Sequence, residues 1–569
     1  MAEEVWMLQT KKADFKQIGA RFRIDPVTAR IIRNRGIEGE TAIDRYLNGT
    51  LDDLYDPMLL KDMERAVSIL CEAVDTGKKI RIVGDYDIDG VCSTYILLQA
   101  FERLGSDVDF EIPDRIKDGY GINESIIEQA HADGVEVILT CDNGISAFHQ
   151  VELAKKYGMT VVITDHHEVP LDGEKEKIPP ADAVIDPKQA DCPYPFPEIC
   201  GAVVAYKLVQ VLYARRGVPQ MEWLDLLEFA AIATVGDVMK LQDENRILVK
   251  YGLKKMAQTK NLGLRRLAEK NNLDLGAITA YHIGFVIGPC LNAGGRLKTA
   301  KEALALLRAQ SEEEAERLAE ELKELNDTRK DMTEQGTEAA KLQVESWYQK
   351  DKVLVVFLPE CHESLAGIIA GRLREYYQKP AIVLTRGEEA VKGSGRSIDE
   401  YHMFKKLTEV SDLLLKFGGH PLAAGLSLEE KNIDEFRRRL NENAGLTEED
   451  FKAKVWIDVP MPVGYVTERL VRELSCLEPF GQGNEKPLFA EKSLRIRASR
   501  VLGRNRNVVK MTLEETDGHA IEALYFGDGT AFEEERAGRR EIDVVYYPDI
   551  NEYNGRKTLQ AVIRYKFRG

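Results

Sequence analysis

The sequence predicts a multidomain α/β protein whose main part is a doubly wound domain built on a mostly parallel sheet. Three observations support this fold class. Short apolar runs alternate with amphipathic stretches between residues 60 and 240. Acidic and imidazole residues repeatedly follow the apolar runs, at the sheet edge where open α/β folds carry their binding sites. The chain has 569 residues, which is too long for one core and predicts about three to four domains.

The composition is that of a soluble globular protein, with 44% hydrophobic and 30% charged residues. No apolar run approaches the roughly 20 residues of a membrane span, and the N-terminus lacks the apolar segment of a signal peptide. We therefore expect a cytoplasmic protein without membrane association. The eight cysteines include no CxxC pair, so we expect free thiols. The formal charge of −17 disfavours a nonspecific nucleic-acid coat but allows a local basic patch.

The alternation between residues 60 and 240 gives the elements of the parallel domain in order. Apolar runs predict strands, and the stretches between them predict helices long enough for right-handed βαβ crossovers. The predicted strands are 79–84, 108–112, 135–140, 159–164 and 181–185, and the predicted helices are 90–104, 124–132 and 145–157. The preceding residues 1–50 contain helix-like pieces without identifiable chemistry, and we interpret them as an N-terminal cap.

Three carboxylates, Asp85, Asp87 and Asp89, follow the first predicted strand at alternating positions. Like charges this close raise one another's pKa or require a counter-ion, which a divalent metal would supply. Turn formation and helix capping also favour Asp, so this segment alone does not decide between a metal site and a turn. An EF-hand is rejected, because it needs a preceding helix and a glutamate at position 12, where this chain has Ile96.

Other acidic and imidazole residues follow neighbouring elements of the same predicted domain. Asp142 follows the third strand, and the Asp-His-His triplet at 165–167 follows the fourth, so all of them meet at one edge of a parallel sheet. Asp237 ends an apolar helix predicted over 226–235, where a carboxylate opposes the helix dipole and requires a stabilising partner. For His166 alone a structural histidine is the commoner outcome. Together the residues predict metal-centred catalysis.

Residues beyond 310 predict a connecting helix and a second α/β unit. The helix covers 311–349, with Ser311 and Glu314 as a capping box and a solvated acidic face. The second unit has strands 353–357 and 381–384 around a helix at 364–377.

Two glycine-flanked clusters in this second unit supply polar groups suited to phosphate. They contain Ser394, Arg396 and His420. Backbone amides exposed by glycine, together with a hydroxyl, a guanidinium and an imidazole, form a reasonable phosphate cradle. Two ordinary glycine turns are the simpler alternative for each cluster taken alone.

The C-terminal region from about residue 451 predicts a small β-barrel. Short strands joined by glycine turns are typical of such barrels. The predicted strands are 455–459, 488–490, 494–502, 508–513, 521–526, 542–547 and 557–565. Seven cations and no acid lie between residues 492 and 510, a pattern that suits single-stranded nucleic acid when aromatic residues are nearby. The candidate contact residues are Arg495, Arg497, Arg500, Arg504, Arg506 and Tyr553, and Tyr525 and Phe526 are also expected to be available for stacking.

The motifs together resemble a known family. Asp-Tyr-Asp-Ile-Asp-Gly, Cys-Asp-Asn-Gly, Asp-His-His and Gly-Asp resemble, in this order, the four motifs of the DHH phosphoesterase superfamily. Ser-Gly-Arg-Ser at 394–397 and Gly-Gly-His at 418–420 resemble its companion DHHA1 domain. With the C-terminal β domain, the chain from about residue 50 resembles the RecJ family of single-strand-specific exonucleases. We therefore expect an N-terminal cap at 1–50, a DHH catalytic domain at 51–308, a connecting helix at 309–349, a DHHA1 substrate-binding domain at 350–450 and an OB-like nucleic-acid-binding domain at 451–569.

The resemblance implies two divalent cations, Mn²⁺ or Mg²⁺, for which carboxylate and imidazole ligands are suited. It assigns one ion to Asp85, Asp87 and Asp142, with Asp142 bridging to a second ion held by Asp89, His166 and Asp237.

Other residues receive roles from the same resemblance. Asp165 would orient a ligand histidine, and His167 would act at the scissile phosphate or in proton transfer. Arg115 and Arg296, the latter after a glycine-rich turn, correspond to arginines near the substrate. A surface salt bridge explains Arg115 equally well from the sequence.

The function implied is a metal-dependent exonuclease that hydrolyses single-stranded DNA from the 5′ end and releases 5′-mononucleotides, in DNA recombination and repair. We expect a monomer, with a helicase and a single-strand-binding protein as candidate partners. One alternative is a DHH phosphodiesterase acting on short oligoribonucleotides or nucleotide-derived phosphates, although such enzymes generally lack this C-terminal domain. Another is an inactive single-strand-binding scaffold, although no motif residue is missing. The preferred metal, tolerance of RNA, processivity, groove width, partners and the role of residues 1–50 stay open.

Overall fold

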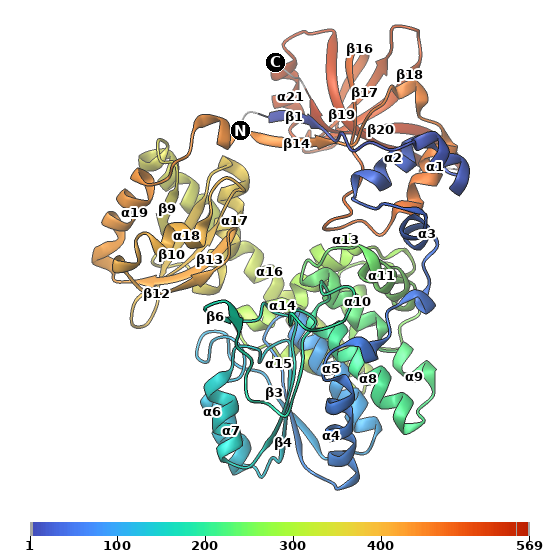
Figure 1. Ribbon diagram of the computed structural model, residues 1–569. Helices are drawn as coiled ribbons and strands as arrows, with labels where there is room; N and C mark the ends of the chain where they lie inside the picture. The colour runs from blue at the N-terminus through green and yellow to red at the C-terminus, as the bar shows by residue number, and fades with distance from the viewer. Residues whose placement is uncertain (1–3, 554, 567–569) are drawn as a thin grey trace. The chain divides into compact units, whose positions relative to one another are not determined.

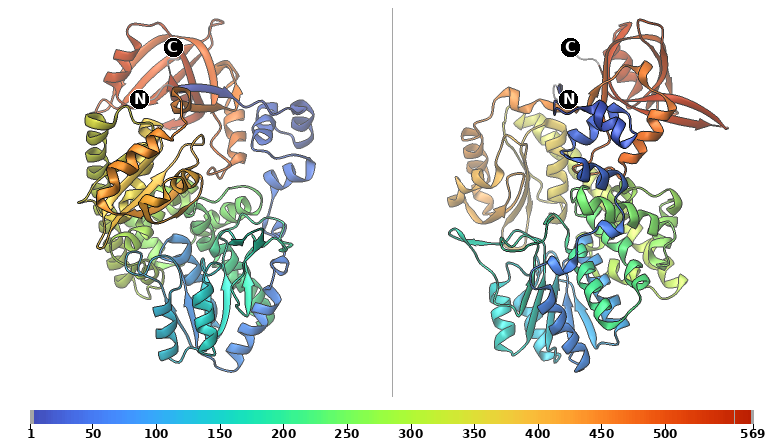
Figure 2. Two further views of the ribbon diagram at one scale, coloured as in Figure 1. Left: turned by 60° about the vertical axis from the view of Figure 1, so that its left-hand side comes forward. Right: turned by 45° about the vertical axis from the view of Figure 1, so that its right-hand side comes forward.

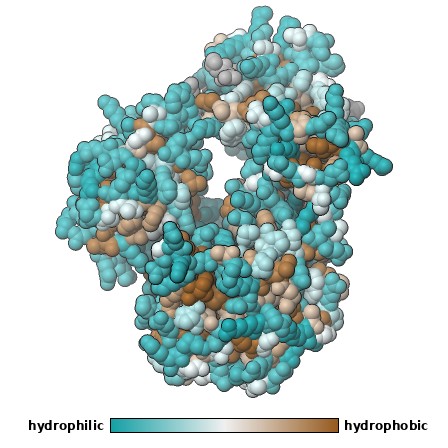
Figure 3. All heavy atoms as spheres, in the orientation of Figure 1, coloured by the Kyte–Doolittle hydropathy of each residue, from teal (hydrophilic) through white to brown (hydrophobic). Residues whose placement is uncertain are grey.

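The computed structural model describes residues 4–553 and 555–566, apart from the side chains of Tyr553 and Arg556. The chain forms two compact units (Figure 1). Of the described residues, the first unit contains 54–240 and 244–452, and the second contains 4–53, 241–243, 453–553 and 555–566. The visible surface of each unit is mainly hydrophilic (Figure 3). In the described part of the chain, we find no helix whose length and hydropathy would allow it to cross a membrane.

The first unit begins with the predicted parallel sheet, which is confirmed. Its strand order is β3-β2-β4-β5-β8, and every neighbouring pair is parallel. The strands are β2 (Ile80–Val83), β3 (Val108–Glu111), β4 (Val137–Cys141), β5 (Thr160–Thr164) and β8 (Ala183–Ile185). Helices α6 (Glu124–Ala132) and α7 (Phe148–Lys156) cover one face, and α4 (Met63–Asp75), α5 (Ile88–Arg103) and α8 (Gly201–Arg216) cover the other (Figures 1 and 2).

A helical layer continues the first unit beyond the sheet. It contains α9 (Gln220–Leu224), α10 (Leu227–Gly236), α11 (Asp243–Met256), α12 (Leu262–Lys270), α14 (Gly288–Leu297), α15 (Lys301–Leu307) and the long α16 (Glu312–Gln343). The prediction of a glycine-rich turn before Arg296 is wrong, because these residues form α14. Its glycines permit close packing instead, since a Cβ at Gly295 would lie 2.3 Å from the Tyr86 carbonyl oxygen.

The second α/β region of the first unit has a five-stranded sheet of order β12-β13-β11-β10-β9. Its strands are β9 (Leu354–Phe357), β10 (Ala381–Arg386), β11 (Val391–Arg396), β12 (Leu414–Gly419) and β13 (Ala423–Leu428), with α17 (Ala366–Tyr377), α18 (Met403–Thr408) and α19 (Ile433–Glu442) packed beside them. Ser394 and Arg396 therefore lie on a strand rather than in a glycine turn.

The C-terminal strands form one sheet that closes on itself. Its order is β15-β16-β17-β18-β20-β19, and an additional pairing of β16 with β19 completes the ring. The strands are β15 (Val459–Pro460), β16 (Phe489–Leu502), β17 (Val508–Glu514), β18 (Ala520–Phe526), β19 (Glu541–Tyr553) and β20 (Arg556–Lys566). The expected strands 488–490 and 494–502 are one strand with an irregularity between Glu491 and Leu494. Ser493, at φ 58°, has the left-handed conformation that such a bulge requires.

The N-terminal residues belong to the same unit as this ring. Strand β1 (Glu4–Leu8) pairs in parallel with β14 (Ala453–Ile457). Helices α1 (Phe15–Phe22), α2 (Pro26–Asn34) and α3 (Glu40–Asn48) share a hydrophobic core with the C-terminal strands. The side chains of Arg35 and Asp458, 7% and 5% exposed, form a buried ion pair with a shortest distance of 2.6 Å.

Candidate metal centre and phosphate pocket

The six predicted metal ligands form two adjoining groups. Suitable ligand atoms of Asp85, Asp87 and Asp142 lie within 4.8 Å of one another, and those of Asp89, His166 and Asp237 do the same. The groups meet where Asp142 Oδ1 lies 3.0 Å from His166 Nε2. These residues come from the ends of strands β2, β4 and β5, the N-terminus of α5 and the end of α10, so the convergence expected at one sheet edge is observed. Their role as ligands stays a prediction.

Local backbone geometry explains why the first motif ends in glycine. Asp87 caps α5, since its carboxylate accepts hydrogen bonds from the backbone N–H groups of Asp89 and Gly90 at 2.9 and 3.1 Å. A Cβ on Gly90 would lie 2.3 Å from the Asp85 carbonyl oxygen, so only glycine allows this close approach. The motif thereby turns the chain from β2 into α5 while keeping its carboxylates together.

Asp89 lies at the N-terminus of α8, a feature that the sequence analysis missed. Its carboxylate accepts hydrogen bonds from the N–H groups of Gly201 and Ala202, both at 2.7 Å. The positive end of the helix dipole stabilises this negative charge. Gly201 is also required for space, because a Cβ there would lie 2.7 Å from the Asp142 Cβ. In the sequence, Gly201 at the start of the largely apolar run 201–213 could have indicated this helix N-terminus.

Burial and mutual repulsion make these carboxyl groups difficult to ionise without a cation. Burial, followed by the charge of Asp87, raises the pKa of Asp85 to about 8. Burial, followed by the charge of Asp89, likewise raises the pKa of Asp237 to about 8, and burial raises that of Asp142 well above its usual range. Bound divalent cations would remove the repulsion. A set of carboxylates and one imidazole fits Mn²⁺ or Mg²⁺.

The Asp165 carboxylate contacts the imidazole ring of His167 rather than that of the predicted ligand His166. Its Oδ1 lies 2.8 Å from His167 Nδ1, and it also accepts the backbone N–H of His166 at 2.7 Å. Burial disfavours the charged imidazole of His167, but the hydrogen bond and charge of Asp165 prevail and raise its pKa to about 9. The ring that Asp165 can orient is therefore that of His167, whose side chain is 43% exposed.

Two further residues at this site were not predicted. The Tyr120 hydroxyl donates to the Asp142 carbonyl oxygen at 2.8 Å and lies 3.0 Å from His167 Nδ1. Asp186 is fully buried directly after β8, and burial raises its pKa to about 7. The strand-end rule that identified Asp142 would also have identified Asp186. Tyr120 lies in an irregular connection, where no periodic pattern marks it.

Four of the five predicted phosphate-binding residues line one cavity of ≈ 560 Å³ in the first unit: Arg115, Arg296, Ser394 and Arg396. Arg396 Nη1 lies 3.1 Å from Ser394 Oγ. A Cβ on Gly367, in the first turn of α17, would come within 2.9 Å of both side chains, so glycine lets them approach this helix end. Tyr86, between two predicted ligands, also lines the cavity.

The cavity concentrates positive charge. Burial, followed by the nearby charges of Arg115 and Arg329, lowers the pKa of Arg296 to about 10. Arg115 has its guanidinium 4.7 Å from the centre of the Tyr86 ring, and the described residues give it no ion pair in place of this contact. Glu363, the acidic residue among those lining the cavity, is paired with Lys392 at 3.1 Å. The remaining guanidinium groups can therefore bind an anion.

His420 is not brought into this cavity. Its exposed side chain directly follows β12. A role in phosphate binding stays a prediction.

The predicted nucleic-acid face of the closed sheet is exposed and basic. Of its cations, Arg497 is paired with Glu514 at 3.2 Å and Lys510 with Glu522 at 2.9 Å. Tyr525, expected to be available for stacking, packs against the core beside Phe532, whereas Phe526 is 61% exposed. The side chain of Tyr553 lies outside the described residues. The exposed arginines are Arg495, Arg497, Arg500, Arg504 and Arg506.

Comparisons with known proteins agree with these three regions. Family models match the chain at residues 79–234 (DHH family, N-terminal domain), 350–445 (DHHA1 domain) and 457–565 (RecJ OB domain). The single-stranded-DNA-specific exonuclease RecJ of Bacillus subtilis (strain 168) is 36% identical over 98% of this chain and 70% of its own length. The Escherichia coli (strain K12) protein of the same name is 34% identical over 95% of both chains.

Solved structures give the same result. The crystal structure of RecJ in complex with Mn²⁺ from Thermus thermophilus matches with a TM-score of 0.84 at 28% identity, over 99% of this chain and 79% of that one. A RecJ structure with Mg²⁺ from the same organism matches with a TM-score of 0.78 at 27% identity, over 99% of this chain and 78% of that one. This chain therefore belongs to the RecJ family of DHH-type, single-stranded-DNA-specific exonucleases.

Proposed function

We propose that this chain is a metal-dependent exonuclease that hydrolyses single-stranded DNA from the 5′ end, releases 5′-mononucleotides and acts in DNA recombination and repair. One observation carries the proposal: two adjoining groups of metal-ligand side chains lie beside a cavity lined by arginines. Tyr86 links them, because it lies between Asp85 and Asp87 in sequence and lines the cavity. Family membership supports the substrate class.

Asp85, Asp87 and Asp142 would hold one divalent cation. Asp89, His166 and Asp237 would hold another, with Asp142 shared between the two ions. Cations held there would activate water and stabilise the charge that develops on the phosphodiester. Asp87 and Asp89 serve a second purpose in the chain itself, since one caps α5 and the other is held by the N-terminus of α8. These backbone hydrogen bonds fix the carboxylates before any ion binds, which reduces the cost of ordering the site.

His167 would act on the scissile phosphate. With a pKa of about 9, its imidazole is protonated at neutral pH and can donate a proton or a hydrogen bond to a phosphate oxygen. Asp165 holds the ring at Nδ1, and the Tyr120 hydroxyl lies 3.3 Å from Nε2. Tyr120 contacts the same ring and so restricts its orientation further.

The arginine-lined cavity would bind the terminal 5′-phosphate and thereby set the polarity. Forked guanidinium groups match phosphate oxygens, and Ser394 supplies a hydroxyl donor. A terminal monophosphate carries more charge than an internal phosphodiester, so a cavity with unpaired guanidinium groups favours a chain end. The exposed arginines of the C-terminal ring would gather the single strand.

The proposal also covers the domain boundaries, the cellular location, the oligomeric state and the protein partners. We place the predicted domain boundaries at residues 50, 308, 349 and 450, and we expect a cytoplasmic monomer that works with a helicase and a single-strand-binding protein.

Degradation of an end-labelled oligonucleotide tests the proposal. A 5′-phosphorylated single strand, labelled at either end in separate samples, is incubated with Mn²⁺, Mg²⁺ or EDTA beside a blunt duplex. We expect mononucleotides released stepwise from the 5′ end of the single strand, and only with metal. Activity confined to very short oligoribonucleotides would replace the proposal with the DHH phosphodiesterase alternative. Tight binding without hydrolysis in either metal would identify a scaffold.

A further inference from the structure

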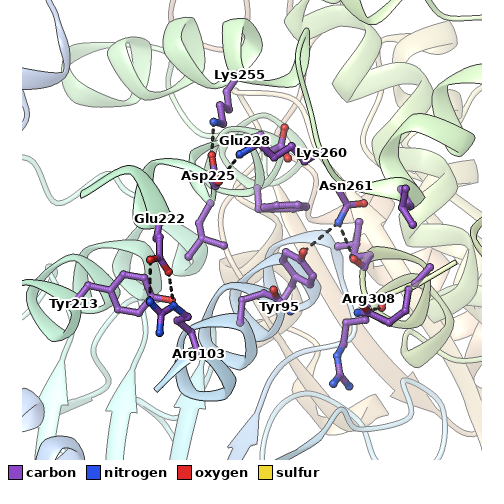
Figure 4. A pocket seen from close by; sticks show the side chains of 17 residues that line it. Tyr95, Arg103, Tyr213, Glu222, Asp225, Glu228, Lys255, Lys260, Asn261 and Arg308 are labelled. Atoms are coloured by element: carbon purple, nitrogen blue, oxygen red, sulfur yellow. Dashed lines mark hydrogen bonds and ion pairs between the residues drawn. The ribbon is translucent and has the colours of Figure 1, made fainter. Parts of the chain in front are cut away.

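A second cavity of ≈ 450 Å³ lies in the first unit, among helices α5, α8, α10 and α11 and the start of α12 (Figure 4). We call it the α5–α10 pocket. Arg103, in its wall, is 14 residues along α5 from Asp89, which corresponds to about 20 Å of helix. Glu228 and Asp237 likewise lie at opposite ends of α10. The pocket is therefore separate from the metal centre.

Glu228 supplies a buried polar group inside this pocket. Its side chain belongs to a residue that is only 3% exposed, and its Oε1 accepts a hydrogen bond from the Thr259 hydroxyl at 2.7 Å. Its Oε2 has no hydrogen-bond partner among the described residues. Burial raises the pKa of this carboxyl to about 7. An unmatched buried oxygen is costly, so a ligand that offers an N–H donor would be stabilised here.

The rim of the pocket carries cations that are only partly neutralised. Lys255 and Lys260 both contact Asp225, the latter with Nζ 3.2 Å from Oδ2, so two positive charges share one carboxylate. Arg103 forms two hydrogen bonds with Glu222 on another side of the pocket. Figure 4 shows Lys255, Lys260, Asp225 and Glu228 gathered at one wall. An anionic group could bind beside the two lysines.

Much of the remaining wall is apolar. The rings of Tyr95 and Phe229 lie 4.3 Å apart, and Leu226 and Leu307 extend this surface. Asn261 fixes the Tyr95 hydroxyl through a hydrogen bond of 3.1 Å. A flat, partly apolar ring fits such a wall, and ligand pockets commonly combine an apolar lining with a few fixed polar groups.

We propose that the α5–α10 pocket binds a nucleoside 5′-phosphate, with an N–H group of the base donating to Glu228 Oε2 and the phosphate beside Lys255 and Lys260. The choice of this ligand class rests in part on the proposed function, whose product is a nucleoside 5′-monophosphate. The three features of the pocket require a donor, a flat ring and an anion in one molecule of moderate size, and a mononucleotide combines them.

Calorimetric titration of the full-length chain in EDTA tests the inference. The probes are dGMP, dAMP, dCMP and dTMP, with deoxyguanosine and inorganic phosphate as fragments. We expect saturable binding of at least one mononucleotide, tighter than either fragment. Glu228→Gln should weaken it about tenfold or more, because the amide presents a donor where the ligand needs an acceptor while its oxygen still accepts from Thr259. Lys255→Met should also weaken binding, whereas the neighbouring exposed Lys254→Met should not.

Two variants distinguish mononucleotide binding in this pocket from the activity of the metal centre. Asp142→Ala should bind the mononucleotide as the wild type does, and Glu228→Gln should still hydrolyse single-stranded DNA. Absence of mononucleotide binding, binding of phosphate alone, or binding unchanged by both Glu228→Gln and Lys255→Met would overturn the inference. A chain that hydrolyses DNA but binds no mononucleotide in EDTA disproves only the pocket assignment. A chain that binds the mononucleotide without hydrolysing DNA disproves only the proposed function.

Discussion

The metal centre and the second unit differ in how their key contacts are encoded. The predicted metal ligands lie between positions 85 and 237, each near the end of a strand or helix of one continuous α/β pattern. The buried ion pair of the second unit joins Arg35 to Asp458, which are 423 positions apart. Chemistry in this chain therefore lies in short motifs placed by regular elements, whereas the stability of the second unit depends on pairs that no local pattern reveals.

For the metal centre, the largest effect is expected from the substitution Asp142→Ala. Removing the carboxylate shared by both ligand groups should lower kcat by more than about 10²–10³-fold, the scale for losing one group that stabilises transition-state charge. DNA binding, measured by fluorescence anisotropy, should stay near the wild-type value. The exposed Asp172→Ala is the control and should change neither quantity. Loss of DNA binding with retained turnover would contradict the shared role of Asp142.

The substitution Arg35→Ala tests whether the stability of the second unit depends on its buried ion pair. This change leaves Asp458 buried without its partner, and loss of one member of a buried pair costs about 3–5 kcal/mol. The free energy of unfolding of the second unit, measured with denaturant, should fall by that amount. The control is Arg21→Ala, which removes an exposed pair with Glu40 worth about 0–1 kcal/mol. Equal effects of the two variants would show that the buried Arg35–Asp458 pair does not stabilise this unit.

A smaller effect is expected from Arg396→Ala in the arginine-lined cavity. Loss of a charged hydrogen-bond donor costs about 1.5–3 kcal/mol, so kcat/KM for a 5′-phosphorylated strand should fall about 10–100-fold. The value for a 5′-hydroxyl strand should change little, because that end lacks the terminal phosphate. Arg386→Ala, on the exposed part of β10, serves as the control. If both strands lose activity equally, the cavity does not recognise the 5′-phosphate.

A further effect, on thermal stability, concerns pH. Asp85 and Asp237 have raised pKa values of about 8 in the folded, metal-free chain, so their contribution to stability is complete below pH 4 and is lost as the pH rises towards 8. The midpoint of thermal unfolding of the first unit in EDTA should therefore decrease by a few degrees between pH 5 and pH 8. Mn²⁺ should abolish this decrease, because it binds the ionised carboxylates. A decrease of the same size with Mn²⁺ would argue against these carboxylates as ligands.

The sequence was sufficient for the parallel sheet and for the residues at its edge. Each strand of that sheet lies within two residues of its predicted bounds, because buried parallel strands give continuous apolar runs. Asp142 and the 165–167 triplet could be placed because a parallel sheet brings its strand ends to one edge. Ser394 and Arg396 were identified by residue type, although the strand that carries them was not predicted.

Other features could not be predicted, for identifiable physical reasons. Arg296 lies in a helix because its glycines allow close packing, and glycine alone does not distinguish packing from a turn. Tyr120 reaches His167 from an irregular connection that has no periodicity. The parallel pairing of β1 with β14 joins segments from the two ends of the chain, and a short strand carries no information about a partner this distant.

The number of Mn²⁺ ions bound per chain tests the central claim most directly. Equilibrium dialysis with metal analysis should find two ions per wild-type chain, and turnover should rise with occupancy of the weaker site. Asp142→Ala should lose both ions at the same free Mn²⁺ concentration, since both ligand groups depend on this carboxylate. A single ion at full turnover, or two ions retained by Asp142→Ala at wild-type affinity, would contradict the account.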